Sequence, residues 1–192
     1  MRRILGCKRN WTMEVEMKEK RILIIGSPGA GKSTLARKLA KKLDLPLVYL
    51  DQIWHRKDCT TLSRAEFDER LQTELAKPAW IIDGNYMRTL AMRLQKTDLV
   101  IYLDYPTELC LQGIKERIGK PREDLPWQET KLDPGFEAFV KDFPSKKGQI
   151  KHDLQEYGRH CRVLVFHSRN EADAFVQSLP DADSENGQER SA

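Results

Sequence analysis

The feature that most constrains the fold is the stretch ILIIGSPGAGKST at residues 22–34. Its four aliphatic residues predict a buried strand, and Gly26 to Ser33 match the pattern GxxxxGK followed by Ser or Thr at every fixed position. Apolar residues then recur at helical spacing over residues 33–43, so a helix is expected directly after the loop. A strand, a glycine-rich loop and a helix in this order are typical of a loop that binds phosphate groups.

The residue types in this loop suit a nucleoside triphosphate. Glycines allow backbone N–H groups to turn toward phosphate oxygens, and the helix directs its positive end at the same anion. Lys32 is expected to reach the β- and γ-phosphates of ATP, and the Ser33 hydroxyl to ligate Mg²⁺. The predicted nucleotide-binding residues are those of the whole loop: Gly26, Ser27, Pro28, Gly29, Ala30, Gly31, Lys32, Ser33 and Thr34.

Beyond the loop, apolar runs and helical patterns alternate along the chain. One predicted helix opens with Ser63 and Glu66 as a capping box, and another with Thr107 as its cap. The predicted strands are 22–25, 47–51, 80–83, 99–104 and 162–167, and the predicted helices are 33–43, 63–76, 88–97, 107–118, 136–157 with an interruption at Pro144, and 171–179. This alternation predicts an α/β protein with the three-layer P-loop NTPase fold: a five-stranded parallel sheet, helices on both faces and a short lid.

The same pattern predicts one domain. We expect a flexible N-terminal extension at 1–20, a domain over 21–180, and a disordered tail at 181–192, which is polar and lacks periodicity. Within the domain, residues 52–78 are expected on the acceptor side. The proline-broken region 119–135 is expected to form the lid.

Composition limits the classes of partner. The net charge is +4, without a long basic run, so no nucleic-acid partner is expected. No apolar run approaches the length of a membrane span. The four cysteines form no CxxC pair and are most simply free thiols, which favours a cytoplasmic location. Nothing in the sequence requires more than a monomer.

The sequence after the loop favours a kinase over other phosphate-loop proteins. The chain has no guanine-reading NKxD segment, and its fourth predicted strand ends in the single acid Asp104 followed by proline. Small-molecule and nucleoside monophosphate kinases place acceptor-binding residues after the second and third strands, followed later by a lid that carries arginines. Asp51, Asp83, Arg117 and Arg122 fall in those places.

The segments GSPGAGKST, LDQIWH, DGNY and LDYP carry a family resemblance over roughly residues 21–180. They resemble the adenylate-kinase and shikimate-kinase group, and within it most of all the bacterial DNA topology modulation proteins, an adenylate-kinase-related branch. The resemblance implies a P-loop kinase that transfers the γ-phosphoryl group of Mg-ATP to a small-molecule or nucleotide acceptor.

The resemblance also implies roles for single residues. Arg117 and Arg122 become the lid arginines that neutralise the transferred phosphoryl group, although a solvated helix face for Arg117 and an internal ion pair for Arg122 remain open. Asp51 would orient or deprotonate the acceptor hydroxyl, or else serve as a helix cap or turn residue. Asp104 would bond to a magnesium-bound water, because it ends the strand beside the phosphate loop.

The segment that starts at Asp83 departs from the family pattern. DGNY resembles the DGxPR segment of nucleoside monophosphate kinases, but Tyr86 replaces the proline, and after one inserted residue Arg88 takes the place of the phosphate-gripping arginine. Whether Arg88 grips an acceptor phosphate decides between a nucleotide and another acceptor, and both remain open. In the loop after the last strand, Arg169 or Asn170 is expected near adenine.

Two other classes of function remain as alternatives. One is an ATP-dependent nucleic-acid-binding modulator of DNA topology, whose only candidate basic segments are 41–42 and 145–152. The other is a nucleotide-binding regulator without transfer chemistry, for which the lid arginines and Asp51 would be unnecessary.

Overall fold

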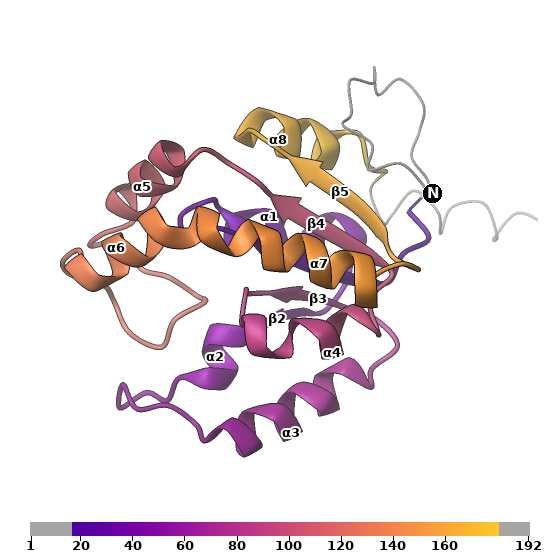
Figure 1. Cartoon of the computed structure of the whole chain (residues 1–192), viewed down its shortest axis with the longest axis horizontal. Coiled ribbons are helices and arrows are strands. Elements are labelled where there is room, and N and C mark those ends of the chain that lie inside the picture. Colours follow the sequence, from indigo (N-terminus) through magenta and orange to yellow (C-terminus); the bar gives the residue numbers. More distant parts are fainter. Residues whose placement is uncertain (1–16, 181–192) are drawn as a thin grey trace, which may run out of the picture.

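Five parallel strands form the sheet at the centre of the molecule (Figure 1). They are β1 Arg21–Gly26, β2 Leu47–Tyr49, β3 Trp80–Asp83, β4 Leu99–Leu103 and β5 Arg162–Phe166, in the order β2-β3-β1-β4-β5. This computed structural model describes residues 17–180. The expected tail at 181–192 and residues 1–16 of the expected extension lie outside these residues.

Helices connect the strands and cover the sheet on both faces (Figure 1). They are α1 Lys32–Leu43, α2 Leu50–Trp54, α3 Arg64–Leu75, the 3-10 helix η1 Met87–Thr89, α4 Leu90–Leu94, α5 Thr107–Glu116, α6 Pro134–Asp142, the 3-10 helix η2 Phe143–Lys146, α7 Lys147–Tyr157 and α8 Arg169–Gln177. In the part of the chain that the structure describes, no helix is long and apolar enough to cross a membrane.

The helices form two layers, one on each face of the sheet, and a hydrophobic cluster lies between the sheet and each layer. Successive strand residues point to opposite faces, so Ile22 and Ile24 pack with α1, α5, α6 and α8, while Leu23 and Ile25 pack with α2, α3, α4 and α7. β1, β3 and β4 are buried along most of their length, as expected for strands covered on both faces. The predicted three-layer α/β architecture is confirmed.

Several predicted boundaries differ from the structure. The strand expected over 47–51 ends at Tyr49, because Leu50 turns into the core and starts α2 together with Asp51. Thr107 is the first residue of α5 and not its cap. The helix expected over 88–97 is a 3-10 turn followed by the short α4.

Other local predictions are confirmed. Ser63 Oγ accepts a hydrogen bond from the backbone N–H of Glu66 at 3.2 Å, and the Glu66 carboxylate accepts one from the N–H of Ser63 at 2.9 Å, which completes the capping box of α3. Pro144 lies in η2 and interrupts the long helical stretch between α6 and α7. The expected lid at 119–135 overlaps a loop over residues 117–133, here called the lid loop, because α6 already begins at Pro134.

The strand order places the functional segments. All strands are parallel, so their carboxyl ends lie at one edge of the sheet. The phosphate loop, residues 26–34, follows the central strand β1 at this edge. Segments that follow β2 and β3 lie on one side of it, and segments that follow β4 and β5 lie on the other.

Candidate active site

A pocket of about 930 Å³ opens at the carboxyl edge of the sheet, around the phosphate loop. On one side it is lined by α2 and by the residues that follow β3, and on the other by α5 and α8. The lid loop and the first turns of α6 complete its wall. The pocket therefore joins the segments that sequence analysis assigned to nucleotide, acceptor and lid.

The backbone of the phosphate loop needs glycine at specific positions. Gly29 has φ +82°, and a Cβ there would lie 2.1 Å from the backbone oxygen of Cys110 in α5. Gly31 has φ +91° and open space where a Cβ would point, so its conformation alone favours glycine. The loop therefore packs closely against α5 and leaves its inner side open to the pocket.

Lys32 begins α1 and points along the loop. Its Nζ donates a hydrogen bond to the backbone oxygen of Ser27 at 3.1 Å. Burial lowers the pKa of this ammonium, and the nearby carboxylates of Asp83 and Asp51 oppose that shift. A half-buried lysine that donates to a loop carbonyl and has two carboxylates nearby suits the binding of a polyanion.

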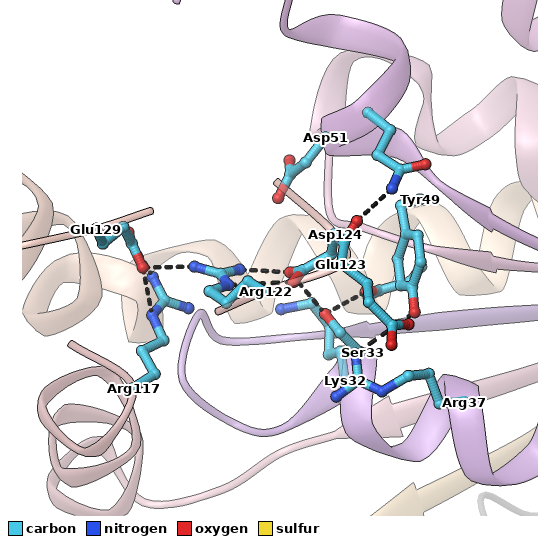
Figure 2. A network of polar contacts seen from close by, with 12 residues as sticks. Lys32, Ser33, Arg37, Tyr49, Asp51, Arg117, Arg122, Glu123, Asp124 and Glu129 are labelled. Atoms are coloured by element: carbon cyan, nitrogen blue, oxygen red, sulfur yellow. Dashed lines mark hydrogen bonds and ion pairs between the residues drawn. The ribbon is translucent and has the colours of Figure 1, made fainter. Parts of the chain in front are cut away.

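Ser33 contacts two carboxylates. Its Oγ lies 2.5 Å from Asp83 Oδ2. The same Oγ lies 3.0 Å from Asp124 Oδ2 of the lid loop, and Figure 2 shows these two residues side by side. One hydroxyl proton serves only one of these oxygens at a time. Asp83 ends β3 and is 5% exposed, and its second oxygen, Oδ1, is buried without a hydrogen-bond partner. Burial raises the pKa of Asp83 to about 6, against the lowering effects of Lys32 and Ser33.

These oxygens fit Mg²⁺, which prefers hydroxyl, carboxylate and water ligands. Ser33 Oγ and the unpartnered Asp83 Oδ1 are the candidate holders. Within residues 17–180 no group of three or more His, Cys, Asp or Glu side chains is arranged to hold a metal ion by itself. Most of the coordination would therefore come from phosphate and water, as is usual for this ion beside a nucleotide.

Asp104 does not lie where the metal assignment requires it. It follows β4, but its Oδ1 lies 2.6 Å from Lys147 Nζ of α7, and Asp104 is not among the residues that line the pocket. Its carboxylate is thus used to attach α7 to the sheet edge. The carboxylate of Asp83 contacts Ser33, whereas that of Asp104 pairs with Lys147, so the contact of Asp104 with a magnesium-bound water stays a prediction without support from this arrangement.

Both predicted lid arginines line the pocket, and both are paired within the lid loop (Figure 2). Arg117 Nη2 donates to Glu129 Oε1 at 3.2 Å, and Arg122 Nη1 donates to Glu129 Oε2 at 2.5 Å. Arg122 also pairs with Asp124. The ion pair considered for Arg122 is therefore present, and it holds the guanidinium at the pocket wall.

On the other side of the pocket, Asp51 is held by Tyr86. Tyr86 Oη donates a hydrogen bond to Asp51 Oδ1 at 2.8 Å, and burial together with the Asp51 charge raises the pKa of this phenol. The Tyr86 ring stacks on Phe67 of α3, with centroids 5.0 Å apart. Across the opening, Trp127 of the lid loop packs edge-on against His55, with centroids 4.7 Å apart.

Arg88 lies outside the pocket. Its guanidinium binds Asp68 of α3 with two hydrogen bonds, of 2.8 and 2.6 Å, and the Arg88 side chain is 43% exposed. Arg88 is not among the pocket-lining residues. The arrangement gives no support to a grip of Arg88 on an acceptor phosphate.

Two residues that shape the site were missed by sequence analysis. The Asn85 side chain accepts from the Gly26 N–H at 3.0 Å and donates to the Gly26 carbonyl at 2.6 Å. The fully buried Arg93 donates to the carbonyls of Gly84, at 2.7 Å, and Tyr86, at 3.0 Å, and also to that of Asn85. An arginine on the apolar side of the pattern RTLAMRL was the available signal for Arg93.

The nucleotide side of the pocket includes Arg169, which the sequence placed near adenine, whereas Asn170 is not among the lining residues. Phe136 and Phe139 of α6 also line this region, with stacked rings 6.4 Å apart, and Arg117 lies over the Phe136 ring. Flat rings and guanidinium groups suit a purine base.

Parts of the amino-acid sequence are similar to known proteins. Residues 22–97, which include the phosphate loop and Asp83, match the family described as "ATPase family associated with various cellular activities (AAA)". The adenylate kinase of Rickettsia rickettsii is 29% identical over 190 residues, which cover 81% of this chain and 89% of the relative. The adenylate kinase of Mycolicibacterium vanbaalenii is 29% identical over 133 residues, 54% of this chain and 72% of the relative.

Among solved structures, a shikimate kinase from Bacteroides thetaiotaomicron matches with a TM-score of 0.52 at 18% identity, covering 83% of this chain and 95% of that one. The fold is the three-layer α/β P-loop fold, which this shikimate kinase shares. The sequence is similar to adenylate kinases, and the fold is similar to that of a shikimate kinase. The expected relation to DNA topology modulation proteins stays a prediction.

Proposed function

We propose that the chain is an ATP-dependent phosphotransferase that passes the γ-phosphoryl group to a small-molecule or nucleotide acceptor. The observation that carries the proposal is the position of two carboxylates in one pocket. Asp83 lies against the phosphate-loop residue Ser33, and Asp51 is held toward the same pocket by Tyr86. A P-loop kinase fold and adenylate kinase relatives support this assignment.

The phosphate loop is proposed to bind the triphosphate. Its backbone N–H groups and the Lys32 ammonium contact the β- and γ-phosphates, and Ser33 and Asp83 hold Mg²⁺ or its water ligands. When bound, Mg²⁺ supplies positive charge to the phosphate oxygens. Asp83 performs this role in its ionised form, so its pKa of about 6 leaves it competent at neutral pH.

Asp51 is proposed to act on the acceptor. Its carboxylate accepts the proton of the acceptor hydroxyl while the hydroxyl oxygen attacks the γ-phosphorus and ADP leaves. Tyr86 orients this carboxylate through its hydrogen bond. Arg117 and Arg122 already line the pocket, so small side-chain movements would exchange Glu129 for the phosphoryl group that is transferred.

The alternative of a DNA-binding modulator finds no support in the candidate basic segment at 145–152. Lys147 pairs with Asp104, and Lys146 pairs with Asp142, so these lysines form ion pairs within the chain. The lid arginines and Asp51 would have no purpose in a regulator without transfer chemistry.

The test is ADP release from Mg-ATP in the presence of nucleoside monophosphates, nucleosides, sugars and hydroxy acids. Lys32→Ala should lower kcat/KM by about 100-fold or more, since it removes a cation that contacts the transferred group. Lys41→Ala, an exposed lysine on the same helix, is the matched control and should retain activity. Normal turnover by a folded Lys32→Ala protein, checked by circular dichroism, would refute the assignment.

The variant Asp51→Asn distinguishes an effect on the acceptor from an effect on ATP binding. We expect it to reduce acceptor turnover by about 100-fold while the Kd for ATP, measured by calorimetry, changes little. Equal losses in both measurements would assign Asp51 to the nucleotide or to the fold.

A further inference from the structure

The charges at the acceptor end of the pocket limit what the acceptor can be. We define the acceptor end as the pocket residues that follow β2 and β3, together with the lid tryptophan that packs on them: Asp51, His55, Gly84, Asn85, Tyr86 and Trp127. Asp83 lies between this end and Ser33. Among these described residues there is no lysine or arginine, and two are carboxylates when Asp83 is counted.

The cations of the pocket lie elsewhere. Lys32 belongs to the phosphate loop, and Arg169 belongs to α8 on the opposite side. Lys38 of α1 pairs with Asp173 of α8. The lid loop carries the others: Arg117, Lys120 and Arg122. Arg37 of α1 reaches β2, but there its Nη1 lies 3.4 Å from Tyr49 Oη, and Figure 2 shows it beside Glu123. The positive charge is therefore concentrated where the triphosphate is proposed to bind.

Two arginines near the acceptor end are directed away from the pocket. Arg88 is neutralised by two hydrogen bonds to Asp68. Arg93 is fully buried behind the segment Gly84–Tyr86 and donates to the three backbone carbonyls of that segment. Neither guanidinium is free to receive a phosphate or carboxylate of the acceptor.

The carboxylates of Asp51 and Asp83 make the electrostatic potential at the acceptor end negative. Lys32 is the cation whose charge these two carboxylates share, and the triphosphate is proposed to use it as well. An acceptor with its own phosphate or carboxylate would bring a third negative charge next to Asp51 and Asp83, with no further cation at the acceptor end. A hydroxyl, by contrast, donates well to the Asp51 carboxylate. Tyr86, His55 and Trp127 add ring surface, which suits a flat or apolar face of the acceptor.

We propose that the acceptor is an alcohol without negative charge, neutral or cationic, with a ring that lies against these aromatic side chains. This inference rests on the proposed phosphotransferase function and specifies its substrate class. The acceptor O–H proton passes to Asp51, a bond forms between the acceptor oxygen and the γ-phosphorus, and the bond from that phosphorus to the β,γ-bridging oxygen breaks. The products are the phosphate ester and ADP.

The experiment uses matched pairs of compounds that differ by one anionic group. Nucleosides are compared with their 5′-monophosphates, and neutral sugars with the corresponding sugar acids. Direct binding to the wild-type protein is measured by calorimetry with ADP present, and transfer is measured separately with Mg-ATP. We expect the uncharged member of at least one pair to bind and react at least tenfold better than its anionic partner.

The two readouts distinguish the two proposals. Binding of uncharged members without transfer would support the acceptor class and refute the phosphotransferase function. Preferred binding and transfer of the anionic members would refute the acceptor class and retain the function, and would direct attention to Arg37. Failure of every pair to bind would also refute the acceptor class.

A variant that adds a positive charge at the acceptor end gives a second test. His55→Arg places a guanidinium at the acceptor end, and should shift the ratio of kcat/KM toward the anionic member of a pair by at least tenfold. Gln72→Arg adds the same charge on an exposed position of α3 outside the pocket and should leave the ratio unchanged. An equal ratio in both variants would contradict the proposal.

Discussion

Opposing effects act on the pKa of the Asp83 carboxyl. Burial disfavours its charge and raises its pKa to about 6, while Lys32 and the Ser33 hydroxyl favour the charge. At neutral pH the carboxylate is ionised and available to a cation. Slightly acidic solution protonates it.

This raised pKa makes a prediction for stability. The folded state holds the Asp83 proton up to about pH 6, whereas the unfolded chain releases it near 3.8, so the stability contribution is present below 3.8 and is lost as the pH rises through 6. The variant Asp83→Asn carries no proton that is released in this range, so its free energy of unfolding does not fall for this reason as the pH rises. Relative to wild type, the variant should gain about 3 kcal/mol of unfolding free energy between pH 4 and 7, measured by urea unfolding without divalent cations.

Asp68→Asn is the control for that experiment. Its hydrogen bonds to Arg88 lower the pKa of Asp68, so its contribution is lost only as the pH falls below the ordinary range of a carboxyl. The difference between this variant and wild type should stay constant from pH 5 to 7. Parallel curves for Asp83→Asn and wild type would show that Asp83 is not the buried acid we describe.

The residues of the phosphate loop could be predicted from sequence because their geometry is local. The roles of Asp83 and Asp104 could not, because Asp83 ends β3, Asp104 follows β4, and both strands lie beside β1. Only the side-chain contacts, Asp83 with Ser33 and Asp104 with Lys147, distinguish them. Asp83 was expected to bind the acceptor, and the structure places its carboxylate against Ser33.

At the scale of elements, a side chain from α4 supports the backbone of the segment between β3 and η1. Arg93 donates to the carbonyls of Gly84, Asn85 and Tyr86, and so fixes the position from which Tyr86 reaches Asp51. These hydrogen bonds hold residues 84–86, which belong to no helix or strand, at the carboxyl edge of the sheet.

Arg93→Met keeps most of the side-chain volume and removes the Arg93 donor from the carbonyls of Gly84 and Asn85, whereas that of Tyr86 still accepts from Thr89. We expect the free energy of unfolding to fall by about 3 kcal/mol, because buried acceptors would lose a charged partner. Arg88→Met, five positions earlier, breaks a half-exposed ion pair and should cost under about 1 kcal/mol. Chemical denaturation of both proteins gives the comparison, and similar losses would refute a special role for Arg93.

Most elements could be predicted because their hydrophobic periods are clear, and the capping box of α3 is confirmed. The early end of β2 could not, since the run Leu47–Asp51 is apolar up to its last residue and only the burial of Leu50 in the core turns the chain. The segment after it contains α2, which puts Asp51 in a helical first turn.

At the scale of the molecule, the lid loop connects the two sides of the pocket. Asp124 contacts Ser33, and Glu129 binds both lid arginines (Figure 2). The Glu123 carbonyl accepts a hydrogen bond from Gln52 of α2. Asp124 thus lies beside the hydroxyl that we assign to Mg²⁺, and bound Mg-ATP has to replace it.

We therefore expect Asp124→Asn to bind Mg-ADP about three- to tenfold more tightly, since a negative charge next to the phosphate site is removed. Calorimetry measures the Kd. Glu123→Gln, which neutralises the adjacent carboxylate, is the control and should change the Kd less. Weaker binding by Asp124→Asn would instead make this carboxylate part of the nucleotide or metal site.

The pair of hydrogen bonds between Asn85 and Gly26 has a mechanical consequence. The Asn85 side-chain amide hydrogen-bonds to both the N–H and the carbonyl of Gly26, where the phosphate loop begins. Asn85 itself belongs to the acceptor end of the pocket. Thermal displacement of one segment is thereby transmitted to the other. For the proposed transfer, we therefore expect the distance between ATP and the acceptor to vary less than the position of either side of the pocket.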